Sequence, residues 1–391
     1  MNPTDGSPKP PILLMVAGAA GAVASTVAAA VAAASETPSA VLPALTTADR
    51  FPYLGSPQTM AFAGWDVPQR SLTEALRSHR VIPDAKWRDL DTAITAMPLL
   101  EAPDPALKLR DQTQQLMDEM RSLRDALPHA HPVLINLLPA CETCGTDGIE
   151  SADELLDRSD PAAFPDLAYV LAAIRSSIPV VNFTPNAVET PAICREAVRA
   201  GVPIAGRDGK TGQTFLKVVL ASAFKARRLT VDGWYSLNIL GNADGENLMD
   251  PARAAGKMQN KTRLLDEILG YAVGHRYGAS THKVHIDYYP PRGDAKEAWD
   301  VIDFSGLFEL PMSLRINLQG RDSILAAPMV IDLARWLAAA QLAGFSGPLA
   351  DLAFFFKKPV GSTPPLQFHD QVARLAEFES ACAQRVGKDN S

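Results

Sequence analysis

The residues best suited to chemistry lie between Gly206 and Lys261. This stretch combines a glycine-rich turn that carries lysine and threonine (Gly206–Thr214), a later run of amides and acids, and two lysines four residues apart. A hydrophobic core has no use for this mixture, whereas a site that holds a phosphorylated polar ligand and moves protons needs it. The stretch therefore predicts a phosphate-handling site with acid–base groups.

The glycine-rich turn provides the phosphate-binding part of this prediction. Its three glycines allow backbone N–H groups to converge, and Lys210, Thr211 and Thr214 offer donors to phosphate oxygens. The GxxxxGK[ST] order of a P-loop is absent. A polar turn that only begins the helix expected over 215–226 is the alternative interpretation.

Amides, a carboxylate and two lysines provide the remaining polar groups. Asn238, Asn242 and Asp244 surround a second glycine-rich loop, and Lys257 and Lys261 lie one turn apart on one face of a helix. In a cleft, each ammonium would lower the pKa of the other. Exposed lysines at this spacing are common, however, so the spacing alone favours a surface pair.

Strands and helices alternate along the first half of the chain. Apolar runs at 11–16, 59–66, 132–138, 178–183 and 201–205 are separated by helical patterns. This order predicts an α/β fold, a Rossmann-type doubly wound parallel sheet.

The first strand leads into a turn of small residues, where a pyrophosphate could approach the N-terminus of the next helix. The turn is a degraded GxGxxG sequence, because Ala20 and Ala24 replace glycines. Asp66 ends the second run, where an acid commonly accepts a hydrogen bond from an adenosine ribose. A helix N-cap before Pro68 explains Asp66 equally well.

The segment Ile12–Ser35 is apolar enough to pass for a signal peptide or a membrane span. Its content of alanine rather than leucine, and its glycines, favour a buried strand, turn and helix instead. We therefore expect a cytoplasmic protein without membrane association.

In the second half, residues 281–290 and 312–318 alternate apolar and polar side chains, as half-exposed antiparallel strands do. They predict an α+β domain with an open sheet. We place the first domain at residues 10–212, completed by 326–391, and the second at 213–325.

Bulk composition excludes some classes of function. The 391 residues carry a net charge of −7, which gives no basic field for nucleic acid. Four cysteines are consistent with reduced thiols in a cytoplasm. Cys141 and Cys144 have the CxxC spacing but no second ligand pair, so unpaired thiols are favoured over a zinc site and no metal is expected.

With these motifs in order, the chain resembles the myo-inositol-1-phosphate synthase family over nearly its whole length. The resemblance rests on nine motifs: the glycine turn ending Ser25-Thr26, Gly64-Trp-Asp66, Asn182-Phe-Thr-Pro-Asn186, Gly206–Thr214, Leu240–Leu248, Lys257-x-x-x-Lys261, Gly293-Asp-Ala-Lys296, Asp322–Pro328 and Lys357-x-Pro359. It implies an NAD-dependent enzyme that closes a carbocycle from a hexose phosphate by oxidation, enolisation, intramolecular aldol addition and re-reduction. It also implies a homotetramer assembled through the open sheet.

The resemblance further implies roles for individual residues. Catalytic residues would be Lys257, Lys261, Lys357, Asp208 and Asp322. Substrate-binding residues would be Asn238, Asn242, Asp244, Lys210, Thr211 and Asp287. NAD-binding residues would be Gly18, Ala19, Ala20, Gly21, Ala22, Val23, Asp66, Asn182 and Asp294.

The chain departs from the family pattern at several of these positions. The fourth active-site lysine of the family would fall on Asp287, an acid pair becomes Arg207-Asp208, and Ala22-Val23 replaces two asparagines. Glucose 6-phosphate as substrate, giving a myo-inositol phosphate, and fructose 6-phosphate, giving a five-membered cyclitol phosphate for carbocyclic nucleosides, therefore stay nearly even. An inactive NAD-binding sensor or scaffold is the third interpretation, which the retained lysines and acids disfavour.

Overall fold

The computed structural model describes residues 11–67, 70–141, 146, 148–158, 164–241, 245, 249 and 264–389. They form two compact units. Of the described residues, the first unit contains those up to Gly209 with 326–364 and 374–389, and the second contains those within 210–325 and 365–373. The C-terminal stretch 326–391, which we expected to return to the first domain as a whole, therefore contributes residues 365–373 to the second unit.

The first unit is built on a seven-stranded sheet in which all strand pairs are parallel. Its order is β11 (Gly347–Pro348), β6 (Pro203–Gly206), β5 (Val180–Asn182), β4 (His131–Asn136), β1 (Ile12–Ala17), β2 (Ala61–Asp66) and β3 (Leu99–Glu101). Without β11 this is the order 3-2-1-4-5-6 of dinucleotide-binding folds. The predicted doubly wound parallel sheet is confirmed.

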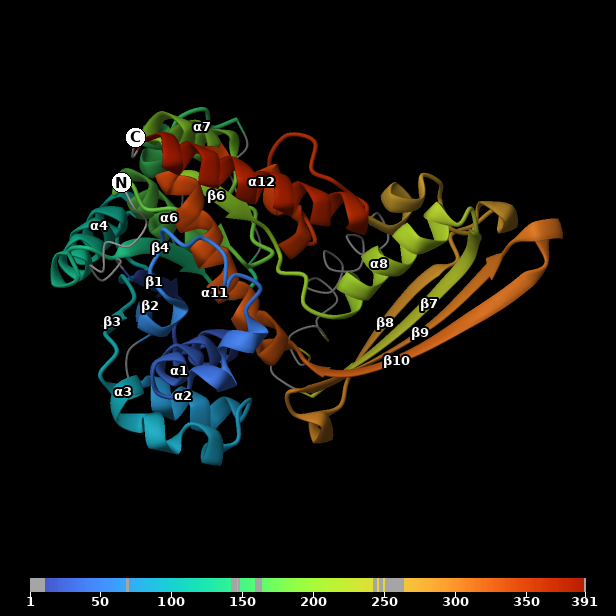
Figure 1. Cartoon of the computed structure of the whole chain (residues 1–391), viewed down its shortest axis with the longest axis horizontal. Coiled ribbons are helices and arrows are strands. Elements are labelled where there is room, and N and C mark those ends of the chain that lie inside the picture. Colours follow the sequence, from blue (N-terminus) through green and yellow to red (C-terminus); the bar gives the residue numbers. More distant parts are fainter. Residues whose placement is uncertain are drawn as a thin grey trace. The chain divides into compact units, whose positions relative to one another are not determined.

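Helices cover both faces of this sheet (Figure 1). Leu14 and Val16 of β1 pack in a core with α1 (Ala22–Glu36) and α11 (Asp322–Leu342), together with α2 (Leu72–His79), α3 (Asp91–Thr95) and α12 (Phe368–Asp389). Leu13 and Met15 pack in a second core with α4 (Leu109–Ala126), α5 (Ala152–Arg158), α6 (Asp166–Arg175) and α7 (Pro191–Ala200). Because both faces are buried, the strands read as continuous apolar runs.

Two apolar segments of the chain belong to this core, which explains their composition. Ile12–Ser35 forms β1, a turn and most of α1, as predicted. Helix α11 is long and apolar enough to cross a membrane by length and composition. However, 78% of its apolar 18-residue stretch is buried inside the protein. That burial is typical of a core helix.

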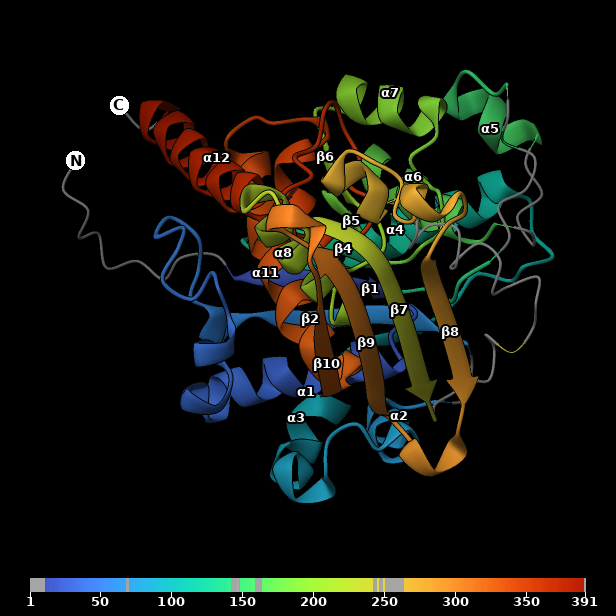
Figure 2. The same ribbon diagram turned by 90° about the vertical axis from the view of Figure 1, so that its right-hand side faces the viewer.

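The second unit contains a four-stranded mixed sheet (Figure 2). Its order is β10 (Pro311–Arg321), β9 (Ala295–Ser305), β7 (Thr230–Leu240) and β8 (His282–Tyr288). Strand β8 runs parallel to β7, so the expectation of an antiparallel strand at 281–290 is wrong, whereas β10 is antiparallel to β9. Alternation of side chains could not distinguish the two directions, because it has the same period in both.

Helix α8 (Gln213–Ala226) packs on one face of this second sheet. Val218 and Ala221 of α8 contact a core that includes Trp234 of β7 and Ile302 of β9. We call the face under α8 the inner face. The opposite, outer face exposes Tyr235 of β7 and Trp299 of β9.

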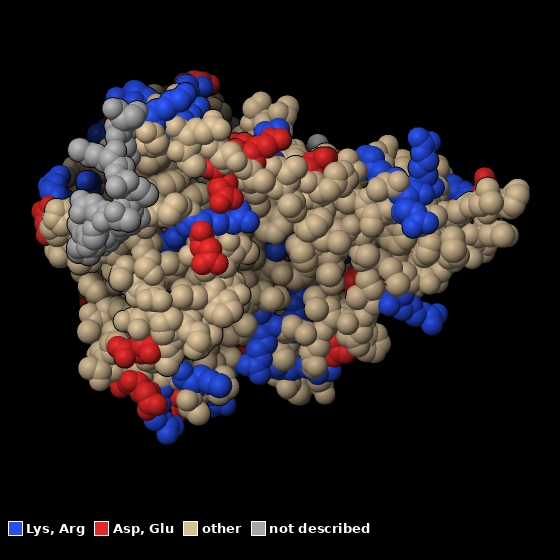
Figure 3. All heavy atoms as spheres, viewed as in Figure 1, with Lys and Arg blue, Asp and Glu red and all other residues tan. Residues whose placement is uncertain are grey.

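Charged side chains on the molecular face drawn in Figure 3 lie in small groups of both signs, separated by uncharged surface.

Candidate functional site

The turn after β1 is shaped for close approach of the backbone. Gly18 has φ of +81°, and a Cβ at this position would lie 2.9 Å from the carbonyl oxygen of Leu137. The N–H groups of Gly18 and Ala19 donate to Trp65 O, and the N–H of Ala20 donates to Asp66 Oδ2 at 2.6 Å. Asp66 therefore holds the turn closed, while a carboxylate retains further acceptor positions.

Helix α1 begins directly after this turn with an open N-terminus. Gly21 is its N-cap residue, no side chain caps it, and its first turn has no acid. The helix N-terminus carries a partial positive charge and unsatisfied N–H groups. It therefore fits a pyrophosphate, and a bulky or acidic residue at Ala22 or Val23 would remove that fit.

Asn182 differs from the expectation of a cofactor ligand. Its side chain is fully buried, and its amide nitrogen donates to Asn186 O and Glu189 Oε1. Its oxygen accepts from Asn136 and Thr184. Because both atoms of its side-chain amide have protein partners, Asn182 supports the loops that follow β4 and β5, and its expected contact with NAD stays a prediction.

In the first unit, backbone pairing brings Lys357 to Asp208. The N–H of Arg207 donates to Lys358 O, and the N–H of Lys357 donates to Asp208 O at 2.7 Å. The two side chains then form an ion pair, with 2.7 Å between Lys357 Nζ and Asp208 Oδ1. Asp208 has φ of +62°, and the adjoining Gly209 leaves no room for a Cβ, which would overlap the ring of Phe183.

Arg207 occupies a largely buried position beside Glu189. Their charged atoms are 3.5 Å apart, and the Glu189 side chain is 3% exposed. Burial raises the pKa of Glu189, and Arg207 opposes that rise. Burial also lowers the pKa of Lys358, with Arg207 adding to the decrease. The cation that replaces an acid of the family pattern is therefore matched by a carboxylate from this chain.

In the second unit, Asp322 joins two groups of different elements. Its Oδ2 lies 3.1 Å from Lys296 Nζ, and its Oδ1 accepts from Thr211 Oγ1 at 3.2 Å. Asp322 begins α11 immediately after β10, while Lys296 lies near the start of β9 and Thr211 in the glycine-rich turn. A cation, a carboxylate and a hydroxyl in contact can stabilise an oxyanion and relay a proton.

Lys296 was not selected as a site residue by sequence reasoning, whereas Asp287 was selected because the fourth active-site lysine of the family falls there. Asp287 is exposed on the outer face of the sheet, since it pairs with Ile239 and alternates with the inner-facing His282. Asp287 therefore lies on the opposite face of the sheet from Asn238, and its expected contact with substrate stays a prediction. Lys296 lies on the same inner face as Ala298 and Asp300, which follow it at intervals of two residues and are buried. This period of two could have identified Lys296 as an inner-facing residue.

Asn238 and Gln213 present unpaired polar atoms on this inner face. Asn238 of β7 is 0% exposed, and neither atom of its amide has a hydrogen-bond partner among the described residues. Gln213, at the start of α8, is 3% exposed, and within the described part of the chain its Oε1 likewise has none. Buried polar groups are normally paired, so these three atoms of Asn238 and Gln213 indicate a polar ligand.

Lys210 lies differently from a phosphate-binding lysine. It is 3% exposed and its ammonium donates to Gln371 Oε1 at 2.9 Å, within the second unit. Burial lowers its pKa to about 7. Its ammonium thus contacts the segment 365–373, and its lowered pKa makes it easier to deprotonate than an exposed lysine.

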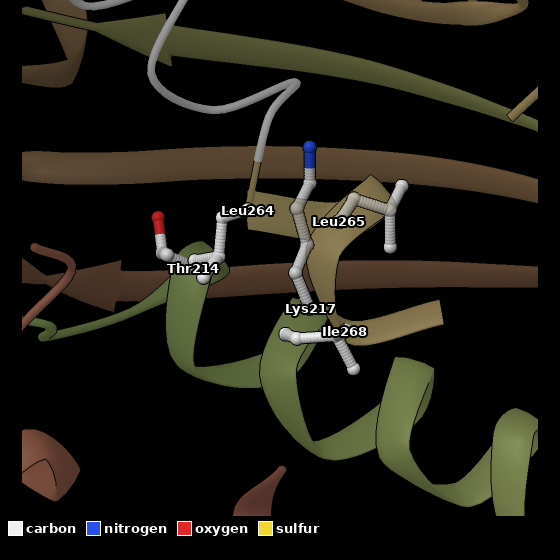
Figure 4. Close-up of a pocket in the computed structure, with 5 residues that line it drawn as sticks. All are labelled: Thr214, Lys217, Leu264, Leu265 and Ile268. Atoms are coloured by element: carbon white, nitrogen blue, oxygen red, sulfur yellow. The ribbon is translucent and has the colours of Figure 1, made fainter. Parts of the chain in front are cut away.

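A small cavity lies beside a second buried lysine, Lys217 of α8. Figure 4 shows its side chain extending from α8 toward the strands, next to Leu264, Leu265 and Ile268. Lys217 Nζ lies 2.9 Å from His282 Nε2, and burial lowers the pKa of Lys217 to about 8. Sequence reasoning did not select either residue.

Four of the residues expected at the site, Asn242, Asp244, Lys257 and Lys261, lie outside the described residues, as does Cys144. Asp294 precedes β9, with 3.5 Å between its Oδ1 and Ser323 Oγ. Among the described residues, no group of three or more His, Cys, Asp or Glu side chains could hold a metal ion. Cys194 and Cys382 form no disulfide within the described part of the chain.

Comparison with known proteins gives one consistent result. Residues 212–323 match the family model of myo-inositol-1-phosphate synthase. An inositol-3-phosphate synthase 1 of Bacteroides thetaiotaomicron is 41% identical over 234 residues, which are 59% of this chain and 54% of that protein. An inositol-3-phosphate synthase of Dictyostelium discoideum is 25% identical over 379 residues, 85% of this chain and 71% of that protein. This chain thus spans only about half the length of the first relative.

The fold is shared with a solved structure. The crystal structure of inositol-3-phosphate synthase from Caenorhabditis elegans aligns with a TM-score of 0.81 at 20% identity, covering 96% of this chain and 86% of that one. At this identity the likeness establishes the fold alone.

Proposed function

We propose that the chain is an NAD-dependent cyclitol phosphate synthase, because residues 212–323 match the family model of myo-inositol-1-phosphate synthase. Its reaction would convert glucose 6-phosphate to a myo-inositol phosphate. The observation that carries the proposal is Asp322, held between Lys296 and Thr211 in the matched region.

The residues of the first unit fit a dinucleotide. The open N-terminus of α1, after the Gly18 turn, would hold the pyrophosphate, and Asp66 would accept from a ribose hydroxyl. Bound there, NAD would accept a hydride from a carbinol carbon of the sugar and return it after ring closure.

The residues of the second unit fit the proton transfers. Oxidation of a carbinol to a ketone acidifies the neighbouring C–H, and the resulting enolate oxygen needs a cation. Lys296 would supply that cation, and Asp322 would orient Lys296 and exchange protons through Thr211. The amides of Asn238 and Gln213 would bind sugar hydroxyls.

Lys357 and Asp208 would form a second acid–base pair. Lys357 would stabilise the oxyanion that develops at the aldehyde during aldol addition, with Asp208 fixing its position. Lys257, Lys261, Asn242 and Asp244 keep the roles implied by resemblance as a proposal, since they lie outside the described residues.

The proposal is tested by incubating the protein with NAD and glucose 6-phosphate and identifying the product by NMR. We expect a myo-inositol phosphate, with NAD required only in catalytic amount because the hydride is returned. Fructose 6-phosphate is tested in parallel. Formation of a five-membered cyclitol phosphate from it would replace glucose 6-phosphate as the assigned substrate. Fructose 6-phosphate was considered because of the acid at Asp287 and the cation at Arg207. Both arguments are weakened, because Asp287 faces outward and Arg207 pairs with Glu189. If neither sugar gives a cyclised product, the remaining interpretation is an inactive NAD-binding protein.

We further propose a cytoplasmic homotetramer that pairs through the outer face of the second sheet. Tyr235 and Trp299 are 45% and 49% exposed on that face. The Trp299→Glu variant should shift a tetramer to smaller species in light scattering at about 10 μM, because it would bury a charge in an apolar contact. Tyr277→Glu, an exposed aromatic off the sheet, is the matched control. A Trp299→Glu tetramer as stable as that of the wild type would contradict this interface.

A further inference from the structure

We propose that Asp300 is a positioning residue that decides which end of the Gln213 amide faces the ligand. Through Asp300, Gln213 is set to accept a hydrogen bond from a ligand hydroxyl. This inference rests on the proposed function and names the group of the substrate that Gln213 recognises.

Asp300 is buried on the inner face of β9 and receives hydrogen bonds from two elements. Its Oδ1 accepts from Trp234 Nε1 at 2.7 Å and from Ser236 Oγ at 2.5 Å, both on β7. Its Oδ2 accepts from Gln213 Nε2 at 2.9 Å, at the start of α8. One carboxylate therefore fixes the first residue of α8 against the strand that carries Asn238.

The chemistry of the carboxylate determines the orientation of the amide. An ionised carboxylate only accepts hydrogen bonds, so Gln213 must turn its NH₂ group toward Asp300. Its oxygen must then point away, and Oε1 is the atom that is buried and has no partner in the described chain. That atom offers an acceptor alone, which suits a hydroxyl and repels the oxygens of a phosphate dianion.

Donors and a cation surround Asp300. The indole N–H of Trp234 can only donate, and Lys217 lies close enough for Asp300 to raise the pKa of its ammonium. Lys217 contacts His282 at 2.9 Å, so the two basic groups together provide a positive charge beneath the sheet. Three donors and a nearby cation therefore leave Asp300 to act as an acceptor in every contact.

The isosteric variant Asp300→Asn would reverse this arrangement. The introduced asparagine would turn its NH₂ toward Gln213, whose amide would rotate to accept, so the NH₂ of Gln213 would face the ligand. We expect about 10- to 100-fold weaker use of glucose 6-phosphate, because one hydroxyl would meet a donor in place of an acceptor. The loss should appear mainly in KM.

The double variant Asp300→Asn with Gln213→Glu separates orientation from stability. It moves the single negative charge from position 300 to position 213, and every side chain keeps its size. The NH₂ of the introduced asparagine then donates to the introduced carboxylate, whose second oxygen again faces the ligand as an acceptor. We expect recovery of most of the lost KM. Asp303→Asn, on the exposed outer face of the same strand, is the matched control.

A series of monodeoxy glucose 6-phosphates identifies the hydroxyl. In the wild type, one deoxy sugar should bind at least about 10-fold more weakly, and this difference should disappear in Asp300→Asn, as in a double-mutant cycle. The inference would be overturned if removal of the hydroxyl weakened binding equally in the wild type and in Asp300→Asn. It would also be overturned if the KM of the double variant were as high as that of Asp300→Asn. Binding of the sugars with NAD is measured by calorimetry, so the test stands apart from turnover. Absence of cyclisation by the wild type would instead refute the proposed function.

Discussion

Replacing Lys296 by methionine should lower kcat by about 10²- to 10³-fold, the effect of removing one group that stabilises a developing oxyanion. The ammonium lies 3.1 Å from Asp322 Oδ2, and its side chain is only partly exposed, so water would not replace it efficiently. Methionine has a similar length and keeps the apolar contacts of the lysine stem. The loss should therefore fall on kcat while the protein stays folded.

The measurement compares the steady-state rate of cyclised product for the two proteins, with circular dichroism to verify folding. Lys283→Met is the matched control, because Lys283 lies on β8 of the same sheet but is exposed on the outer face. Lys296→Arg should keep part of the activity, since the charge remains but the planar fork fits a different geometry. Loss of less than about 5-fold in Lys296→Met would show that Lys296 only pairs with Asp322 and contributes no transition-state stabilisation.

The contrast between Lys296 and Asp287 shows how far sequence reasoning reaches. The alternating pattern predicted strands in both regions, and β8 and β9 are present. Alternation does not tell which of the two faces packs against a helix, however. A shift of one residue moves every side chain of a strand to the other face, so counting back from a motif to Asp287 could not show which face of the sheet that residue occupies.

Contacts between segments that are far apart in the chain could not be predicted from the sequence, for a different reason. Lys357 and Asp208 are 149 residues apart, and they meet because the backbone of residues 206–208 pairs with that of 357–360. No periodicity reports such a pairing. The parallel sheet of the first unit, by contrast, was predicted because its buried strands are short apolar runs separated by helical patterns.

Polar residues next to strands were the hardest to assign. Asn182 and Asn238 are both buried asparagines in or near strand ends, and composition treats them alike. Asn182 has protein partners for both amide atoms, whereas Asn238 has none among the described residues. Only the positions of neighbouring donors and acceptors distinguish a structural amide from one that can bind a ligand.

Replacing Lys210 by methionine should stabilise the protein at pH 6 by about 2 kcal/mol. Burial lowers the pKa of Lys210 from 10.5 to about 7, so below pH 7 the folded protein must hold a buried ammonium. A shift of this size is worth about 4–5 kcal/mol. The lost hydrogen bond to Gln371 offsets about half of that, since a bond to a charged group contributes about 1.5–3 kcal/mol.

The pH dependence follows from proton binding in the two states. Between pH 7 and pH 10.5 the unfolded chain keeps the proton on Lys210 while the folded protein has released it, so wild-type stability rises with pH in this window, by up to about 1.4 kcal/mol per unit. The methionine variant lacks this contribution, and its advantage at pH 6 should vanish by about pH 9. Urea unfolding of both proteins at pH 6, 7, 8 and 9 measures the difference, with Lys86→Met on an exposed turn as the surface-lysine control. Because Lys217 titrates in both proteins, its contribution cancels in the comparison. A difference independent of pH, or a methionine variant less stable than the wild type at pH 6, would mean that the ammonium of Lys210 stays charged in the fold and binds as a fixed cation.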